Sequence, residues 1–460
     1  MPYEAIPTDM NNIRADLLIK NGMFYGMTGD SDKNGAIANV AVKDGKIAAI
    51  ASPGALDAFE YAKVFDASGM VVAPGFVDIH IHDEDFADED TVQHCMIKQG
   101  VTSALAGNCG LGPLFAASAK AREHPWINLA YLIGNCVLRE AVGRTDNYTA
   151  ATEGEISRMK TLLREGMKQG AKGLSLGLEY APGASYEELS ALFGVVSEFE
   201  GRIVAAHIRY DDERSPQSIE EVIRLAEESG VRVQVSHLGS MTMGRTRLCA
   251  DIIALAALRG VDVSFDCYPY DAFCTYAGSA VYDRFAERYS KGAECLEAVS
   301  GKFKNQRLTS ETLAEMRAQE PNALIVAYVM DKDEIEECIA RPDCVVASDA
   351  LSMGGGAHPR VAGTFPRALG ILRKKGYSWS DALAKVTVMP AMRAMLDAGR
   401  LYELANADIT VFDPDGFTDR STFQEPFLPS AGLKLVVING RIAFEDGKIA
   451  SEKNGKFVRA

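Results

Sequence analysis

Apolar runs of strand length alternate with amphipathic helical windows through the middle of the chain. The predicted strands are rich in β-branched residues and end in polar ones. They are residues 72–82, 101–108, 128–135, 173–180, 203–208, 232–237, 261–268 and 344–349. Predicted helices between them include 157–170, 185–199, 218–229 and 248–259. This α/β pattern of eight strands favours a TIM-type (β/α)8 barrel, because no G-x-G-x-x-G follows an early strand as in a Rossmann sheet.

Both ends of the chain have the pattern of a small β-domain. Each alternates short apolar strands with hairpin-type Asn-Gly or Asp-Gly pairs, at positions 21–22, 44–45, 439–440 and 446–447. Neither segment is large enough to enclose a core alone, so we predict that they form one small β-sandwich. The predicted domains are residues 1–70 and 403–460 for the sandwich and 71–402 for the barrel. A small insertion is expected between strands seven and eight, at about 281–343.

Composition fits an enzyme and excludes two other classes of protein. The chain has 460 residues, of which 47% are hydrophobic and 24% charged, and its net charge is -15. A net negative charge without a basic cluster argues against a nucleic-acid or anionic-membrane binder. The N-terminus lacks the features of a signal peptide, and no apolar run reaches the length of a membrane span, so we expect a cytoplasmic protein. The nine cysteines are scattered without paired spacing, which is typical of buried thiols in that compartment.

The first candidate for chemistry is the His-x-His pair at the end of the first barrel strand. Residues two apart in a strand point to the same side, so His80 and His82 would project together where the strand meets its loop. Two neutral imidazoles on one face can begin a metal site. The alternative is a surface pair without a role.

Polar residues at the other strand ends strengthen the metal hypothesis, because barrel active sites form where strands end and loops begin. Four of the seven histidines lie at predicted strand ends. The residues at these ends are His80, His82, Cys109, Glu179, Tyr180, His207, His237 and Asp349. Each has its own structural alternative: a buried thiol, a hydrogen-bonded core histidine or a helix N-cap. One metal with nitrogen, sulfur and oxygen ligands explains the whole set, and this donor chemistry is typical of zinc.

The ordered motifs of the chain resemble those of the amidohydrolase superfamily, in its D-aminoacylase (N-acyl-D-amino-acid deacylase) branch. From about residue 15 to the C-terminus they read P-G-F-V-D-I-H-I-H, Q-G-V-T-S-A-L-A-G-N-C-G, G-L-S-L-G-L-E-Y-A-P-G, H-I-R, S-H-L, D-C-Y-P-Y, S-D-A-L and H-P-R-V-A-G-T-F-P-R. The resemblance implies a barrel with a β-sandwich built from both termini and a small domain inserted late in the barrel. It also implies a metal-dependent hydrolase acting on carbon–nitrogen bonds.

The same resemblance implies a tight zinc site and a second, weaker metal position, formed by Cys109, His207 and His237 and by His80, His82 and Asp349 respectively. Asp349 would also be the catalytic acid/base. Relatives such as hydantoinases bridge two metals with a carbamylated lysine on strand four. Here Lys172 precedes that strand, at the wrong end of the barrel, so Cys109 would serve instead. Metal-activated hydroxide would attack the amide, and Asp349 would carry a proton to the leaving nitrogen.

The substrate-binding residues implied by the resemblance are Arg360, which would grip a carboxylate, and Tyr180 and Tyr270, which would bond to the same end. The alternatives are a surface ion pair for the arginine and simple packing for the tyrosines. Two positions depart from the family pattern. Gly239 stands where D-aminoacylases commonly have a lysine, and Asn135 where relatives often have a histidine.

We therefore predict a zinc-dependent amidohydrolase that cleaves a linear amide C–N bond in a small, carboxylate-bearing substrate, most specifically an N-acyl-D-amino acid. One alternative is a cyclic amide or ureide hydrolase of the hydantoinase or dihydroorotase kind, which the missing lysine slightly favours. Another is an inactive barrel scaffold, against which the intact set of ligands speaks. The sequence leaves open the acyl group, the side chain accepted, the stereochemistry, the number of metals and the oligomeric state.

Overall fold

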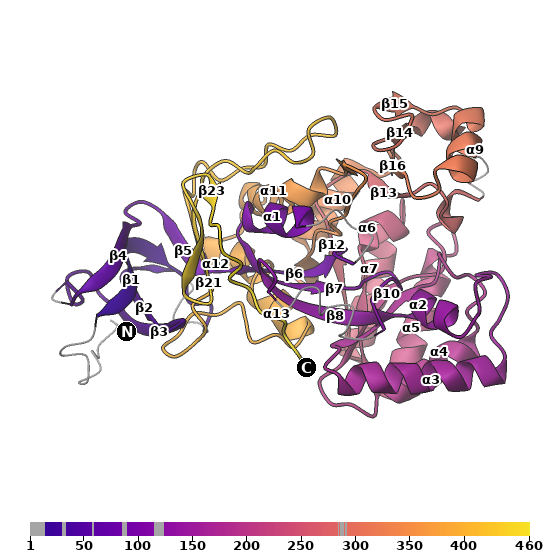
Figure 1. Cartoon of the computed structure of the whole chain (residues 1–460), viewed down its shortest axis with the longest axis horizontal. Coiled ribbons are helices and arrows are strands. Elements are labelled where there is room, and N and C mark those ends of the chain that lie inside the picture. Colours follow the sequence, from indigo (N-terminus) through magenta and orange to yellow (C-terminus); the bar gives the residue numbers. More distant parts are fainter. Residues whose placement is uncertain are drawn as a thin grey trace.

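Eight parallel strands form the predicted barrel (Figure 1). The computed structural model describes residues 14–460 except 30–33, 58, 85–89, 115–123, 284, 286–288 and 290–291, so the N-terminal residues used to predict the location lie outside it. In order around the barrel, the strands are β6 (Phe76–Ile81), β7 (Val101–Ala106), β8 (Asn128–Gly134), β9 (Gly173–Gly177), β10 (Ile203–His207), β11 (Arg232–Val235), β12 (Val263–Cys267) and β17 (Cys344–Val346). Each contains mostly buried residues, as expected for a parallel sheet covered on its outer face by helices.

The barrel closes between its first and last strands just beyond β17. The amide of Asp349 donates to the carbonyl of His80, and the amide of His82 donates to the carbonyl of Ala350, both at 2.8 Å. These bonds bring the ends of β6 and β17 together at the C-terminal rim. Residues predicted to carry the chemistry therefore also complete the barrel.

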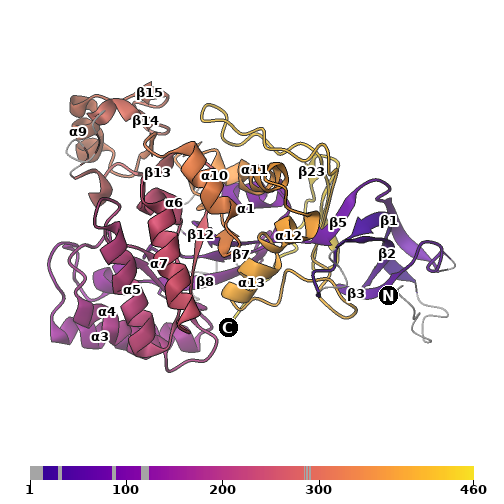
Figure 2. The same ribbon diagram turned by 180° about the vertical axis from the view of Figure 1, so that it is seen from behind.

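Helices cover the outside of the barrel (Figures 1 and 2). Some of them begin at side-chain caps: Thr152 and Glu155 form a capping box at the third helix, and Ser185 caps the fourth. The helices are α1 (Thr91–Ile97), α2 (Asn135–Ala141), α3 (Glu153–Lys168), α4 (Tyr186–Val196), α5 (Ser215–Ser229), α6 (Leu238–Met241), α7 (Thr246–Leu258), α10 (Lys332–Ala340), α11 (Arg360–Lys374), α12 (Trp379–Ala384) and α13 (Val388–Arg393). The alternation of strands and helices predicted from the sequence is confirmed.

Both chain ends contribute to one continuous nine-stranded sheet. Its order is β23 (Lys448–Ile449), β22 (Arg441–Glu445), β21 (Leu433–Ile438), β20 (Ile409–Phe412), β5 (Val71–Pro74), β1 (Ala15–Phe24), β2 (Ala36–Lys43) and β3 (Lys46–Ala51), with β4 (Tyr61–Asp66) paired to β1. The two halves join where β5 and β20 run antiparallel. They share one apolar core, which includes Ile19 and Val40 from the first half and Ile409 and Leu435 from the second.

The predicted first barrel strand, residues 72–82, is in fact two strands. β5 belongs to the terminal sheet and β6 to the barrel, and the chain changes sheets at Gly75. A side chain there would collide with Thr102, since an added Cβ would lie 2.1 Å from its hydroxyl oxygen. The glycine permits the close approach that the change of sheet requires.

A small subdomain separates β12 from β17. It contains a four-stranded antiparallel sheet of β13 (Phe273–Tyr276), β14 (Leu296–Ala298), β15 (Gln306–Arg307) and β16 (Leu324–Ala327), with α9 (Ser310–Gln319). The structure places this subdomain at 273–327, earlier than the predicted 281–343, because α10 packs against α7 and α11 of the barrel. A short hairpin, β18 (Ser352–Met353) with β19 (Gly356–Ala357), follows the last barrel strand.

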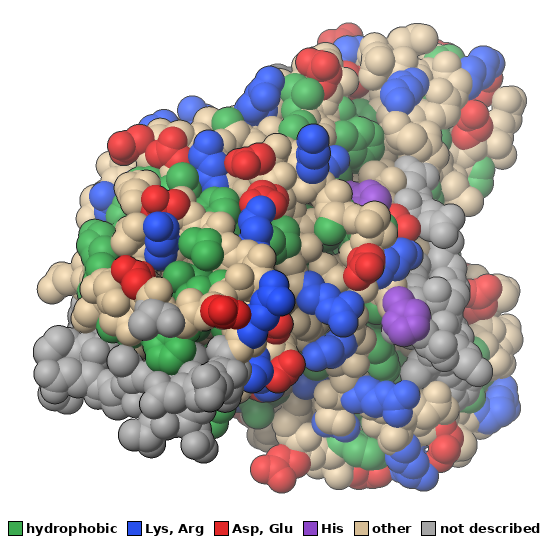
Figure 3. Space-filling view, turned by 60° about the vertical axis from the view of Figure 1, so that its left-hand side comes forward, with side chains coloured by type: hydrophobic (Ala, Val, Ile, Leu, Met, Phe, Trp, Pro, Cys, Tyr) green, Lys and Arg blue, Asp and Glu red, His purple; other side chains and the backbone are tan. Residues whose placement is uncertain are grey.

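The surface carries acidic and basic side chains intermixed, with scattered apolar residues, on the face seen in Figure 3. Among the helices of the described residues, none has the length and apolarity needed to cross a membrane.

The barrel and the terminal sheet are joined by an aromatic cluster centred on Phe76. Its fully buried ring stacks on Phe365 of α11 at 5.8 Å and contacts Phe412 of β20 and Phe417, each at 6.2 Å. One side chain thus packs against a barrel helix and the C-terminal half of the sheet.

We expect Phe76→Ala to lower the free energy of unfolding by about 3–5 kcal/mol, because it removes a buried ring and leaves a cavity between two domains. Denaturant unfolding of the protein measures the change. Leu258→Ala is the control, since that side chain is 83% exposed and its loss should cost no more than about 0.5 kcal/mol. Equal effects of the two substitutions would contradict the junction role.

Candidate metal centre

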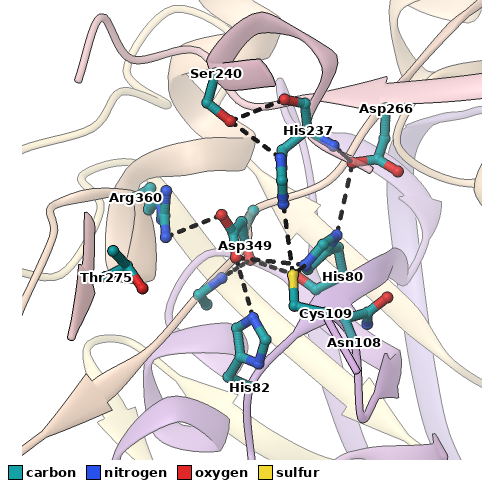
Figure 4. A network of polar contacts seen from close by, with 12 residues as sticks. His80, His82, Asn108, Cys109, His237, Ser240, Asp266, Thr275, Asp349 and Arg360 are labelled. Atoms are coloured by element: carbon teal, nitrogen blue, oxygen red, sulfur yellow. Dashed lines mark hydrogen bonds and ion pairs between the residues drawn. The ribbon is translucent and has the colours of Figure 1, made fainter. Parts of the chain in front are cut away.

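The polar residues at the strand ends converge on one side of the barrel. Figure 4 shows the imidazoles of His80, His82 and His237 and the carboxylate of Asp349 around the sulfur of Cys109. One donor atom from each of His80, His82, Cys109 and Asp349 lies within 4.8 Å of the others. Donors of a second group, Cys109, His207 and His237, meet the same limit. All members of the two groups are buried.

Cys109 belongs to both groups, and its distances fit a tetrahedral zinc site. The sulfur lies 3.4 Å from His80 Nε2 and 3.5 Å from His237 Nε2. Zinc with Zn–S of about 2.3 Å and Zn–N of about 2.0–2.1 Å sets such donors roughly 3.5 Å apart. Each spacing is therefore that of two donors to one ion, with His80 in the first group and His237 in the second.

His207 presents one nitrogen to a carboxylate and keeps the other free. Its Nε2 lies 3.1 Å from Glu179 Oε2, which as a carboxylate can only accept a hydrogen bond. The buried Nδ1 has no hydrogen-bond partner among the residues that the structure describes. A histidine oriented by a carboxylate, with its second nitrogen unsatisfied, is typical of a metal ligand.

The second group is arranged around one oxygen of Asp349. Its Oδ1 lies 3.2 Å from His82 Nε2 and 3.4 Å from His80 Nε2. Its Oδ2 pairs with Arg360 Nη2 at 2.9 Å. Burial opposes ionisation of this carboxyl, but the charges of Arg360 and His80 hold its pKa well below the usual range. Asp349 is therefore ionised at neutral pH.

The thiol of Cys109 is also perturbed by its surroundings. Burial raises its pKa, but the charge of His80 and the adjacent imidazoles of His207 and His237 outweigh this, so the pKa falls well below the ordinary value. Burial raises the pKa of Cys136, in contrast, to about 12. Among the cysteines with shifted pKa values, Cys109 is the one prepared to act as a thiolate ligand.

Backbone conformation sets three of these residues apart. Cys109, His237 and Asp349 have φ values of 53°, 34° and 51°, in the left-handed region that non-glycine residues rarely adopt. Each follows the end of a barrel strand, β7, β11 or β17. The turn aims each side chain into the ring of ligands, at a conformational cost of about 1–3 kcal/mol per residue.

Two supporting carboxylates were not singled out from the sequence. Asp266, at the end of β12, accepts a hydrogen bond from the His237 amide at 2.8 Å, and its Oδ1 lies 3.8 Å from His80 Nδ1. Glu84 places Oε2 3.5 Å from His82 Nδ1. Asp266 lies in the D-C-Y-P-Y motif at a strand end, so the rule that identified the ligands could have found it.

A cavity of about 300 Å³ opens in front of the ligands. Of the predicted substrate-binding residues, Arg360 and Tyr180 line it. The Tyr180 ring packs on His207 at 4.7 Å, and its hydroxyl lies 3.0 Å from that of Thr275. Tyr270 does not line the cavity: its hydroxyl bonds to the Pro359 carbonyl, behind Arg360.

The positions that depart from the family pattern have local explanations. A Cβ on Gly239 would lie 2.3 Å from Ile335 Cδ1, so a side chain there would meet α10. Asn135 accepts a hydrogen bond from the Gly177 amide at 2.8 Å, and so connects the ends of β8 and β9. Lys172 directly precedes β9, at the end of the strand away from the ligands, and its ammonium group donates to the Met395 carbonyl.

Comparison with known proteins gives consistent results. Residues 63–258 match the family model described as "Amidohydrolase family". The chain is similar to the D-aminoacylase of Alcaligenes xylosoxydans xylosoxydans (32% identity, 96% of this chain and 97% of the relative) and to its N-acyl-D-glutamate deacylase (30%, 97% of both). The crystal structure of N-acyl-D-glutamate deacylase from Bordetella bronchiseptica, complexed with zinc and a phosphonate inhibitor, superposes with a TM-score of 0.85 (29% identity, 97% of this chain and 100% of that one).

After metal removal, Cys109 should be the first thiol alkylated by iodoacetamide at pH 7, because the thiolate is the reactive form. Its lowered pKa keeps it ionised below the pH at which an ordinary thiol titrates. Half-buried Cys136 is the internal control, and peptide mass spectrometry measures both. Re-added zinc should protect Cys109, whereas faster labelling of Cys136 would contradict the assignment.

Proposed function

Because the chain belongs to the amidohydrolase superfamily, in its D-aminoacylase branch, we propose that it is a zinc-dependent deacylase of N-acyl-D-amino acids with neutral side chains. The observation that carries the proposal is the contact between Asp349 and Arg360 at the edge of the ligand cluster. It supports a proton carrier, Asp349, beside a carboxylate-binding group, Arg360, at a site where two groups of metal donors meet. The D configuration is proposed from the relatives.

The metal donors are proposed to hold zinc tightly at Cys109, His207 and His237, and a second ion more weakly at His80, His82 and Asp349. Zinc bound there would act as a Lewis acid and would lower the pKa of its water ligand toward neutrality. The unpaired Nδ1 of His207 and the mixed sulfur, nitrogen and oxygen donors support this choice.

Asp349 is proposed to move the proton. Its Oδ2 is held by Arg360, which leaves Oδ1 facing the ligands. Because the carboxylate is ionised at neutral pH, it has lone pairs that can accept a proton from the attacking water. It then returns the proton to the leaving nitrogen, which could not depart as an amide anion.

Arg360 is proposed to bind the substrate carboxylate. Its side chain is buried, and Nε and Nη1 have no hydrogen-bond partner within the described ranges. Only Nη2 is engaged, with Asp349 and with the Cys274 carbonyl at 3.2 Å. The N–H groups of Nε and Nη1 are therefore unpaired donors on a buried, charged guanidinium, and a substrate carboxylate can accept from them.

The cavity wall supports a neutral side chain on the substrate. Its apolar part comprises Leu111, Met241, Phe273, Tyr276, Val281, Leu351 and Met353. Among the described residues that line the cavity, Arg360 is the one lysine or arginine, and Glu179 and Asp211 are acidic. A second carboxylate on the substrate would be buried there against acidic neighbours, which is unfavourable.

All nine cysteines are free, which supports a reducing compartment such as the cytoplasm.

A panel of N-acetyl amino acids tests the proposal. With zinc present, kcat/KM for N-acetyl-D-methionine should exceed that for N-acetyl-D-glutamate and N-acetyl-D-aspartate by roughly 100-fold, because burying an unpaired carboxylate costs several kcal/mol. The L isomer and hydantoins should be poor substrates. Faster opening of hydantoins would instead select the cyclic-amide alternative, and zinc-free, inactive protein would select the scaffold.

Replacing Asp349 by Asn should lower kcat about 10²–10⁴-fold, because the proton carrier is lost. Zinc at Cys109, His207 and His237 should remain, since Asp349 is not in that group. Metal analysis and initial rates measure the two effects. Asp415→Asn, at an exposed position, is the control and should match the wild type; an active D349N protein would remove Asp349 from its role.

A further inference from the structure

The segment 417–430, between β20 and β21, leaves the terminal sheet and lies along the first turns of α11. In Figures 1 and 2 the yellow chain of this region extends over α11. By sequence it belongs to the C-terminal half of the terminal sheet. Four of its residues nevertheless contact residues 358–367, a stretch that includes Arg360.

Two hydroxyl groups converge on the carbonyl that precedes Arg360. Ser421 Oγ donates to the Pro359 carbonyl at 2.9 Å, and the Tyr270 hydroxyl donates to the same oxygen at 3.4 Å. The two hydroxyl oxygens are 3.2 Å apart. Ser421 is 6% exposed, so water cannot easily replace it as a donor.

His358 forms the second link between the segment and Arg360. The Phe423 ring meets its imidazole edge to face at 5.0 Å, and Tyr270 does the same at 5.3 Å. The imidazole Nδ1 accepts a hydrogen bond from the Arg360 amide at 3.0 Å. Phe423 therefore contacts the imidazole that bonds to the backbone of Arg360.

Further contacts fix the segment on the helix itself. Asp419 pairs with Arg367 at 3.3 Å, and Ser430 donates to the Ala362 carbonyl at 3.3 Å. The fit is tight at Gly363, where an added Cβ would lie 2.3 Å from Ser421 Oγ. The segment therefore approaches α11 as closely as a glycine allows.

We propose that the 417–430 segment positions Arg360 for the substrate carboxylate, with Ser421 as the principal positioning residue and Phe423 as a second. The inference rests on the proposed function, in which Arg360 holds that carboxylate. Ser421 acts through the Pro359 carbonyl, at the point where the backbone enters α11. Charge-assisted hydrogen bonds from a planar guanidinium depend on its orientation, so a shift of this turn weakens substrate binding first.

The test compares two substrates that differ only at the group that Arg360 would bind. N-acetyl-D-methionine carries the carboxylate, and N-acetyl-D-methioninamide carries a neutral carboxamide; acetate release is measured for both. For Ser421→Ala we expect KM for the acid to rise about tenfold with kcat nearly unchanged, and kcat/KM for the amide to change less than about twofold. The preference for the acid over the amide should therefore fall about tenfold.

Three variants accompany it. Ser421→Thr, which keeps the hydroxyl, should restore most of the preference. Thr422→Ala is the matched control, because its exposed side chain bonds, among the residues that the structure describes, to the Glu425 amide of the same segment. Phe423→Leu tests the link through His358, and it replaces S421A as the test of the proposal if S421A does not fold. Zinc content and thermal unfolding are measured for each.

An unchanged preference for the acid in S421A and F423L, or a parallel loss with both substrates, would overturn the positioning role. A wild-type protein that releases acetate from neither substrate would instead overturn the proposed function. The activity of the wild-type protein therefore distinguishes failure of the positioning role from failure of the proposed function.

Discussion

The site depends on one buried sulfur atom. The sulfur of Cys109 lies within 3.5 Å of nitrogens of His80 and His237, and it belongs to both groups of metal donors. A thiolate and a carboxylate removed from water are unfavourable unless positive charge compensates them. The imidazoles do so in part, and a bound cation would do so fully. The ligands that make the barrel reactive are thus the groups that most need an ion.

The backbone that holds these ligands also closes the barrel. The amides of His82 and Asp349 connect the first and last strands, so a change in closure would move ligands from both groups. The left-handed residues Cys109, His237 and Asp349 require support from packing around them, because their local conformations are unfavourable. Rigid β-strands and strained strand ends together fix the geometry before any substrate enters.

Much of this could be predicted from the sequence, because strand ends in a parallel barrel meet at one rim. That rule brought His80, Cys109 and His237 together without knowledge of distances. What it could not supply depends on tertiary contacts. The motif that contains Tyr270 does not reveal where its hydroxyl points. The hydrogen bond to the Pro359 carbonyl shows that it lies behind Arg360 rather than in the cavity. Likewise, Gly75 is needed at the change of sheets because Thr102 lies against it. Thr102 belongs to another strand, so no local pattern around Gly75 reveals this contact.

The pairing of β5 with β20 has a consequence for biosynthesis. During translation β5 leaves the ribosome before the barrel strands, whereas β20 leaves it only after the last of them. The nascent chain therefore carries an open strand edge through most of translation, a state prone to aggregation and suited to chaperone binding. The segment behind Arg360 emerges later still. A polypeptide truncated ahead of β20 would have every proposed metal ligand and yet lack half of a sheet and the support for its arginine.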